Sequence, residues 1–123
     1  RIVSDHRRAL LWRNHYRRRA ISYGFAPVIE AFTVAQIVAT YGDACVYCGQ
    51  DWAEIDHFIP IMLDGKHTLT NVRPCCKSCN VKRGNPRMLL AIQHAMLTGS
   101  PIPTVVELPT FPVPDGRRIL LER

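Results

Sequence analysis

Apolar residues recur at helical spacing near the start of the chain. Ala9, Trp12, Tyr16 and Ala20 follow one another at three- and four-residue steps, and arginines occupy the faces between them. This pattern predicts an amphipathic helix over residues 6–21, with one buried stripe and a basic remainder. The letters YGFAP then interrupt the helical spacing.

A second helix is predicted to begin after residue 33, because several helix-start signals coincide there. Thr33 is a favourable N-cap, Gln36 completes a capping box, and Phe32 and Ile37 occupy the two positions of a hydrophobic staple. Gly42 is expected to end this helix.

Two segments in the middle of the chain have the shorter period of β-strands. Residues 52–58 alternate between apolar and polar positions, and residues 67–74 form the second segment. Asp64 and Gly65 mark a turn between them. Together these segments predict a β-hairpin with a long connection.

Two further helices are predicted after the hairpin. Residues 76–83 read as a short basic helix that Gly84 stops. Asn85 can cap the next helix, Pro86 suits its first turn, and the helical pattern continues to Thr98. Its apolar residues are all expected to pack inward: Leu89, Leu90, Ile92, Met96 and Leu97. The elements together indicate a small α+β domain.

The end of the chain is rich in proline. Five prolines lie between residues 101 and 114, which excludes regular secondary structure there. We therefore expect residues 100–123 to form an extended arm that lies on the domain or reaches a protein partner.

The positive charge of the chain is concentrated at its start. The formal net charge is +6, and residues 1–19 hold seven arginines against the single acid Asp5. Such a segment is typical of an element that binds a polyanion, because each neutralised phosphate releases condensed counterions. A solvated helix face is the alternative reading. No apolar run is long enough to span a membrane or to serve as a secretion signal, so we expect a soluble protein.

Five cysteines are present, and four of them form two C-x-x-C pairs. Cys45 and Cys48 make the first pair, and Cys76 and Cys79 make the second. Two-residue gaps and the lack of a secretion signal favour a four-thiolate structural zinc site over a disulfide framework. Cys75 is left over, and we expect it to be a packed small residue.

Four polar residues in the same region have the chemistry of phosphodiester hydrolysis. His57 can take a proton from water at neutral pH. Asp56 offers a carboxylate and Asn80 an amide oxygen, a sparse set that suits magnesium. Asn71 can either accept the other ring N–H of His57 or brace the loop between the strands.

The combined pattern of CVYCG, DHFIP and NVRPCCKSCNVKRG resembles the HNH endonucleases. The resemblance covers residues 45–84 and implies a core of two strands and a helix around one divalent metal. It implies that His57 is the general base, that Asn71 positions it, and that Asp56 and Asn80 hold the catalytic ion. The third motif letter is often histidine, and Asn80 in its place resembles the target-strand-cutting domain of RNA-guided CRISPR nucleases.

An all-oxygen site of this kind should favour Mg²⁺ or Mn²⁺ over transition metals. The expected substrate is DNA, most simply double-stranded, in the cytoplasm of a bacterium or of a phage-infected cell. The expected organisation is a basic helical extension over residues 1–32, a zinc-stapled HNH core over 33–99 and the arm over 100–123. Residues expected to contact nucleic acid are Arg7, Arg8, Arg13, Arg17, Arg18, Arg19, Lys77, Lys82, Arg83 and Arg87.

Two other functions fit parts of this pattern. A zinc-stapled nucleic-acid-binding module without activity needs the cysteines and arginines, but it has no use for the Asp-His-Asn-Asn set. An accessory protein could instead bind a partner through the proline-rich arm. The remaining histidines lack partners at ligand spacing and are interpreted as structural or surface residues: His6, His15, His67 and His94.

Overall fold

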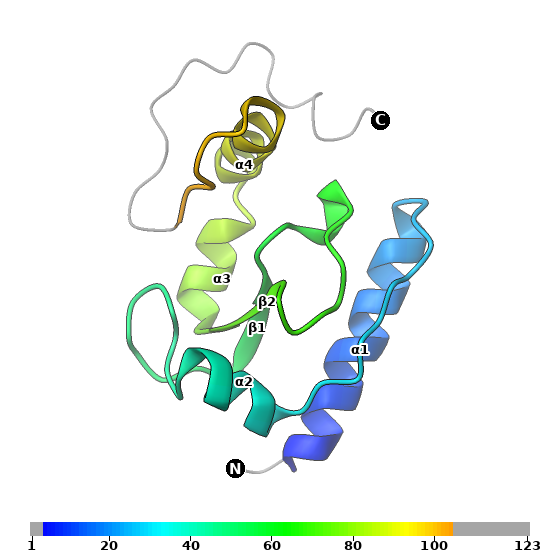
Figure 1. Cartoon of the computed structure of the whole chain (residues 1–123), viewed down its shortest axis with the longest axis vertical. Coiled ribbons are helices and arrows are strands. Elements are labelled where there is room, and N and C mark those ends of the chain that lie inside the picture. The colour runs from blue at the N-terminus through cyan, green and yellow to red at the C-terminus, as the bar shows by residue number, and fades with distance from the viewer. Residues whose placement is uncertain (1–3, 105–123) are drawn as a thin grey trace.

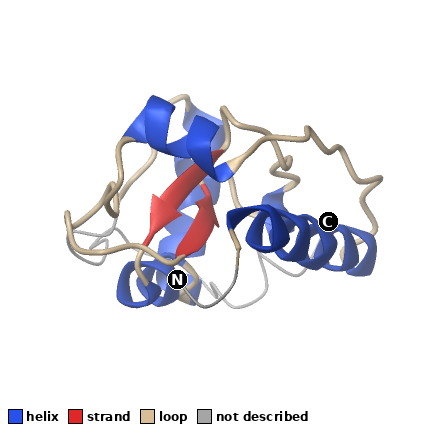
Figure 2. Cartoon of the chain, turned by 90° about the horizontal axis from the view of Figure 1, so that it is seen from below, coloured by secondary structure: helices blue, strands red, loops and turns tan. Residues whose placement is uncertain are grey.

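A two-stranded sheet lies at the centre of the molecule, with helices packed around it (Figures 1 and 2). The computed structural model describes residues 4–104. Its elements in chain order are α1 Asp5–Ser22, α2 Val34–Tyr41, β1 Glu54–His57, the 3-10 helix η1 Ile61–Leu63, β2 Val72–Cys75, α3 Lys77–Arg83 and α4 Pro86–Thr98. Helix α2 packs on β2, α3 packs on β1, and α1 contacts both η1 and α2.

The predicted helix signals are confirmed. Thr33 and Gln36 form both hydrogen bonds of a capping box at the start of α2, and Gly42 ends that helix with a φ of 94°. Asn85 caps α4 through its side chain, and Gly84 ends α3. These local signals act within a few residues of one another, so the fold does not override them.

The hairpin is shorter than the sequence pattern predicts. Strands β1 and β2 pair antiparallel over four residues each, from Glu54 opposite Cys75 to His57 opposite Val72. Part of the predicted connection instead forms η1, and residues 67–71 lie outside β2. The reason is local, because the Asn71 side chain satisfies backbone groups of the connection that a longer strand ladder would otherwise have to pair.

Two buried clusters hold the elements together. The larger one joins α2, the hairpin and the cysteine region, and includes Ile37, Trp52 and Val72. The smaller one joins α1 to η1 through Tyr16, Ala20 and Ile61. Of the predicted stripe of α1, Tyr16 and Ala20 are each 1% exposed, while Ala9 and Trp12 are half-buried.

Helix α4 corrects one prediction about packing. Met96 and Leu97 were expected to point inward, but they are 42% and 81% exposed. The buried residues are Met88, Leu90, Ala91, Ile92 and Ala95. Met88, Ala91, Ile92 and Ala95 recur at three- and four-residue steps and form one buried face. Leu97 lies seven residues after the buried Leu90, and so on the same side of α4, but it belongs to the last turn of the helix, where it is exposed.

The described residues include no helix that is both long and apolar enough to cross a membrane. The predicted proline-rich arm falls mostly outside the described residues, which end at residue 104.

The two leucines of α4 provide a matched test of this packing. Leu90 is 6% exposed and Leu97 is 81% exposed. Leu90→Ala should lower the free energy of unfolding by about 2–5 kcal/mol, because it leaves a cavity. Leu97→Ala should change it by less than about 0.5 kcal/mol. Urea denaturation of the two variants measures the difference, and equal effects would contradict the assigned packing of α4.

Candidate functional site

The two cysteine pairs converge to form one cluster. Cys45 and Cys48 lie in the loop before β1, while Cys76 caps α3 and Cys79 lies in its first turn. All four Sγ atoms lie within 4.8 Å of one another. The Sγ atoms of Cys48 and Cys76 are 3.7 Å apart, close to the roughly 3.8 Å edge of a tetrahedron with Zn–S bonds of about 2.3 Å. The cluster can therefore hold a metal ion.

Backbone groups hold the first cysteine pair in place. The Cys45 N–H donates to Gln50 at 2.8 Å, and the Val46 N–H donates to Pro74 at 3.1 Å, which ties the loop to β2. Burial acts to raise the pKa of Cys45, but backbone hydrogen bonds in the two pairs outweigh it and lower that pKa to about 6. The thiolate form, which is the form that binds metal, is thereby favoured at this position.

Cys75 is separate from the cluster, as the sequence predicts. Its side chain is fully buried in the larger core cluster, and its Sγ donates to the carbonyl of Cys76. Burial raises the pKa of the Cys75 thiol, followed in effect by the nearby Asp56 carboxylate. Cys75 is therefore an inert core residue.

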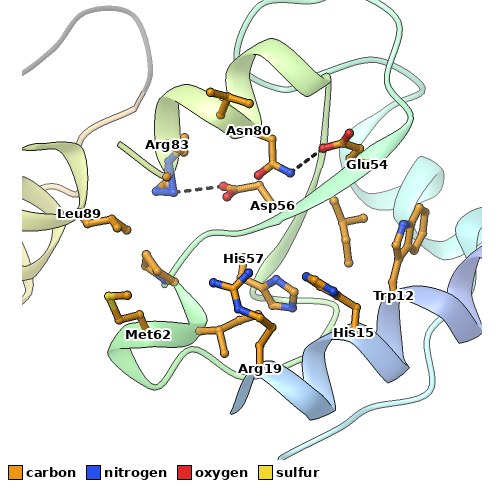
Figure 3. Close-up of a pocket in the computed structure, with 15 residues that line it drawn as sticks. Trp12, His15, Arg19, Glu54, Asp56, His57, Met62, Asn80, Arg83 and Leu89 are labelled. Carbon is orange, nitrogen blue, oxygen red and sulfur yellow. Dashed lines mark hydrogen bonds and ion pairs between the residues drawn. The ribbon is translucent and has the colours of Figure 1, made fainter. Parts of the chain in front are cut away.

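A cavity of about 540 Å³ lies beside the hairpin, between α1 and α3 (Figure 3). It brings together three of the four predicted catalytic residues, Asp56, His57 and Asn80. Trp12 and Leu89 contribute apolar lining, and further polar side chains come from Arg83 and from residues that the sequence did not single out or assigned elsewhere: His15, Arg19 and Glu54. The cavity is therefore built by α1 as well as by the hairpin and α3.

Asp56 is held by two hydrogen bonds to the same oxygen. Its Oδ2 accepts from the Tyr47 hydroxyl at 2.6 Å and from an Arg83 guanidinium nitrogen at 3.1 Å. Among the described residues no partner is bound to Oδ1, which leaves that oxygen for a ligand. Burial raises the pKa of Asp56 above its usual range, against the opposing pull of Arg83 and of the Tyr47 hydrogen bond.

Arg83 occupies a different position from the one expected of a phosphate contact. Its side chain is among the most buried in the described chain, at 2% exposure. Besides Asp56, it donates to the Phe58 carbonyl from both terminal nitrogens, at 3.2 and 2.9 Å. Its guanidinium also lies over the rings of Tyr47 and Phe58. Arg83 therefore holds the carboxylate of Asp56 in place. Lys77, Lys82 and Arg87 are exposed.

The amide of Asn80 is oriented by Glu54. Its Nδ2 donates to Glu54 Oε1 at 2.7 Å (Figure 3). A carboxylate can only accept, so this contact fixes which end of the amide is NH₂ and leaves Oδ1 for another partner. Glu54 lies two residues before Asp56 on β1, so strand alternation places both on one face. That alternation was the signal that could have identified Glu54 from sequence.

Asn71 braces the loop between the strands, which is the second of the two roles predicted for it. Its Oδ1 accepts from the Ile59 N–H at 2.8 Å, and its Nδ2 donates to the carbonyls of Ile59 and Lys66. Its own carbonyl accepts from Phe58 N–H at 2.7 Å. Asn71 thus braces the chain that follows His57 without contacting the imidazole.

The ring of His57 contacts another histidine. Its Nε2 lies 3.0 Å from Nδ1 of His67, and the Tyr16 ring is stacked on it at a centroid distance of 5.5 Å. No partner for His67 was predicted, because the 10-residue separation between the two histidines matches no motif. Burial lowers the pKa of His57 to about 3, and His67, His15 and Arg19 act in the same direction. The imidazole is therefore neutral at neutral pH.

The arginines of α1 divide into two groups. Arg7, Arg17 and Arg18 are exposed. Arg8 instead donates to the Ala53 carbonyl at 2.6 Å and lies over the rings of Trp12 and Trp52, so it attaches α1 to the chain before β1. Arg13 is half-buried, and Arg19 lines the cavity while donating to the Tyr23 hydroxyl.

The hairpin, helix α3 and the cysteine cluster define a metal-binding α+β unit. Residues 45–86 match the family model of the HNH endonucleases, so the chain carries an HNH endonuclease domain in this segment. The matched segment holds both cysteine pairs and all four residues of the Asp-His-Asn-Asn set. Comparison with curated proteins gives no match, and comparison with solved structures gives none.

A pair of cysteine variants tests the metal cluster. Cys48 belongs to the cluster and is exposed, whereas Cys75 is buried outside it. Cys48→Ala should reduce bound metal from one equivalent to far less and lower the unfolding temperature, because a ligand is lost with little loss of packing. Cys75→Ala should keep the metal. Elemental analysis of the purified variants measures both, and full metal content in Cys48→Ala would exclude the assigned cluster.

Proposed function

We propose that this chain is a metal-dependent endonuclease that hydrolyses DNA phosphodiester bonds. The HNH domain assigns it to the nuclease class. The observation that carries the proposal is the shared cavity, which is lined by His57, Asp56 and Asn80 and by the arginine-bearing helix α1. A module that only binds nucleic acid would not need these three groups together.

The proposed role of the cysteine cluster is to bind structural zinc. Four thiols whose Sγ atoms lie within 4.8 Å of one another can surround one zinc ion, and closed four-cysteine zinc sites contribute folding energy directly. The cluster joins the loop before β1 to the start of α3, which are the two elements that carry Asp56 and Asn80. Zinc would then fix the distance between these elements without taking part in the reaction.

The proposed ligands of a catalytic Mg²⁺ or Mn²⁺ are Asp56 Oδ1 and Asn80 Oδ1. Within residues 4–104, the cysteine cluster is the only group of three or more His, Cys, Asp or Glu side chains with ligand spacing. A site with so few protein oxygens suits magnesium, which keeps several waters and takes ligands from substrate phosphate. When bound, this ion would supply charge compensation for the phosphoryl oxygens.

His57 is the proposed general base. Its neutral imidazole accepts a proton from water as the water oxygen bonds to phosphorus and the P–O3′ bond breaks. The departing O3′ takes a proton from solvent, which gives a 3′-hydroxyl and a 5′-phosphate. Without substrate, a pKa of about 3 makes the His57 imidazole a weak base. An anionic phosphate in the same cavity stabilises the imidazolium and raises that pKa, so substrate binding itself strengthens the base.

The proposed DNA-binding surface includes the exposed arginines of α1 and the exposed basic residues of α3 and α4. Arg19 lies in the cavity and is placed to meet phosphate near the reaction, whereas the others contact the backbone at greater distance. Contacts of this kind suit double-stranded DNA of any sequence. The basic residues in this proposal are Arg7, Arg17, Arg18, Arg19, Lys77, Lys82 and Arg87.

His57→Ala tests the base directly. Relaxation of supercoiled plasmid with Mg²⁺ or Mn²⁺ should slow by about 10²–10⁴-fold, the usual contribution of a positioned general base. Metal content and DNA affinity should stay near those of the parent. His94→Ala is the matched control, because His94 is exposed on α4 and does not line the cavity; it should cut at the parental rate.

Two results would contradict the proposal. Equal cutting by His57→Ala and the parent would remove His57 from the mechanism. A parent that binds DNA but never cuts with either ion would instead favour the inactive zinc-stapled module.

Substituting two exposed arginines tests the proposed DNA-binding surface of the protein. Arg17→Gln and Arg18→Gln should each weaken DNA binding and reduce the slope of log affinity against log salt by about 0.9, because one phosphate contact is lost. The effect should not depend on DNA sequence. Binding titrations at several salt concentrations measure the slope, and an unchanged slope in the double variant would exclude this face of α1 from DNA contact.

A further inference from the structure

His67 is one of the most rigidly held side chains in the described chain. It is 2% exposed and lies between η1 and β2. Its backbone N–H donates to the Val28 carbonyl at 3.0 Å, and its carbonyl accepts from Glu30 N–H at 2.8 Å. The Tyr16 and Phe32 rings pack against its imidazole at centroid distances of 5.1 and 4.7 Å. Neither the backbone nor the ring can move without disrupting these contacts.

This fixed ring makes a hydrogen bond with His57. The 3.0 Å contact between His57 Nε2 and His67 Nδ1 needs one proton, which either ring can carry. If His67 donates, Nε2 of the neutral His57 ring is the acceptor and its single N–H is on Nδ1, which then cannot accept a proton from water. If His57 donates from Nε2, its Nδ1 keeps a free lone pair. The direction of this one bond therefore decides whether His57 is a base.

Asn71 cannot control this choice. Both ends of its amide are bound to backbone groups of Ile59 and Lys66, so it does not reach the imidazole. His57 lines the cavity, and its Nε2 is already occupied by His67, which leaves Nδ1 as the other ring nitrogen.

We infer that His67 is a positioning residue that accepts the Nε2–H of His57 and so keeps Nδ1 of His57 unprotonated for the reaction. This inference rests on the proposed function for its role in catalysis, but the tautomer that it assigns to His57 is a property of the free protein. The orienting role is thus carried by His67, from the connection of the hairpin, while Asn71 holds the backbone of that connection.

Three variants separate the hydrogen bond from packing. His67→Phe keeps an aromatic ring between Tyr16 and Phe32 but removes the acceptor, and kcat for cleavage should fall about 10–100-fold with little change in KM. His67→Asn keeps an acceptor oxygen near the Nδ1 position and should recover most of the loss. Phe32→Leu loosens the same packing without removing the hydrogen bond, so its kcat should stay close to that of the parent.

A second readout does not depend on cleavage. Nitrogen-15 NMR of the imidazole rings should show His57 protonated at Nε2 in the parent, and a shift toward a mixture of tautomers in His67→Phe. A parent that carries the proton on Nδ1 of His57 would overturn the inference, as would His67→Phe cutting at the parental kcat. If the parent does not cut DNA at all, the proposed function fails while the NMR result still decides the tautomer.

Discussion

The convergence of four thiols on one point is the constraint on which the site depends. Cys45 and Cys48 belong to the loop before β1, and Cys76 and Cys79 belong to the start of α3. The hairpin between them has only four paired residues in each strand. Such a short ladder is marginal by itself. A metal ion held by the four thiols would fix the start of α3 against β1. Asp56 and Asn80, which these two elements carry, line one cavity.

A buried ion pair between Arg83 and Asp56 also restricts the side chains that line the cavity. Arg83 and Asp56 are paired at 3.1 Å with almost no exposure, and Tyr47 and Phe58 enclose the guanidinium. Breaking such a pair leaves an uncompensated buried charge, which costs several kcal/mol. A carboxylate held in this way keeps one orientation. Glu54 imposes a similar restriction on the amide of Asn80.

Features set by residues close together in the sequence could be predicted, whereas contacts between residues far apart in the sequence could not. The capping box of α2 and the grouping of the two C-x-x-C pairs follow from spacings of a few residues. The burial of Arg83 and its pairing with Asp56 depend on how α3 lies against β1, and the contact between His57 and His67 depends on the path of a loop. Arg83 was predicted to contact nucleic acid. Arginine is rarely buried without a partner, and the partner of Arg83 is 27 residues away in the sequence.

Several residues around the His57 ring lie outside the segment that matches the HNH family model. Tyr16, which belongs to α1, is stacked against both His57 and His67, and its hydroxyl accepts from Val28 N–H. Trp12, His15 and Arg19 complete the cavity wall from the same helix. Residues 45–86 transplanted alone into another protein would lose this aromatic cover and admit bulk water around the two histidines. The smallest transferable unit therefore begins at α1, because this helix forms part of the cavity wall as well as carrying exposed arginines.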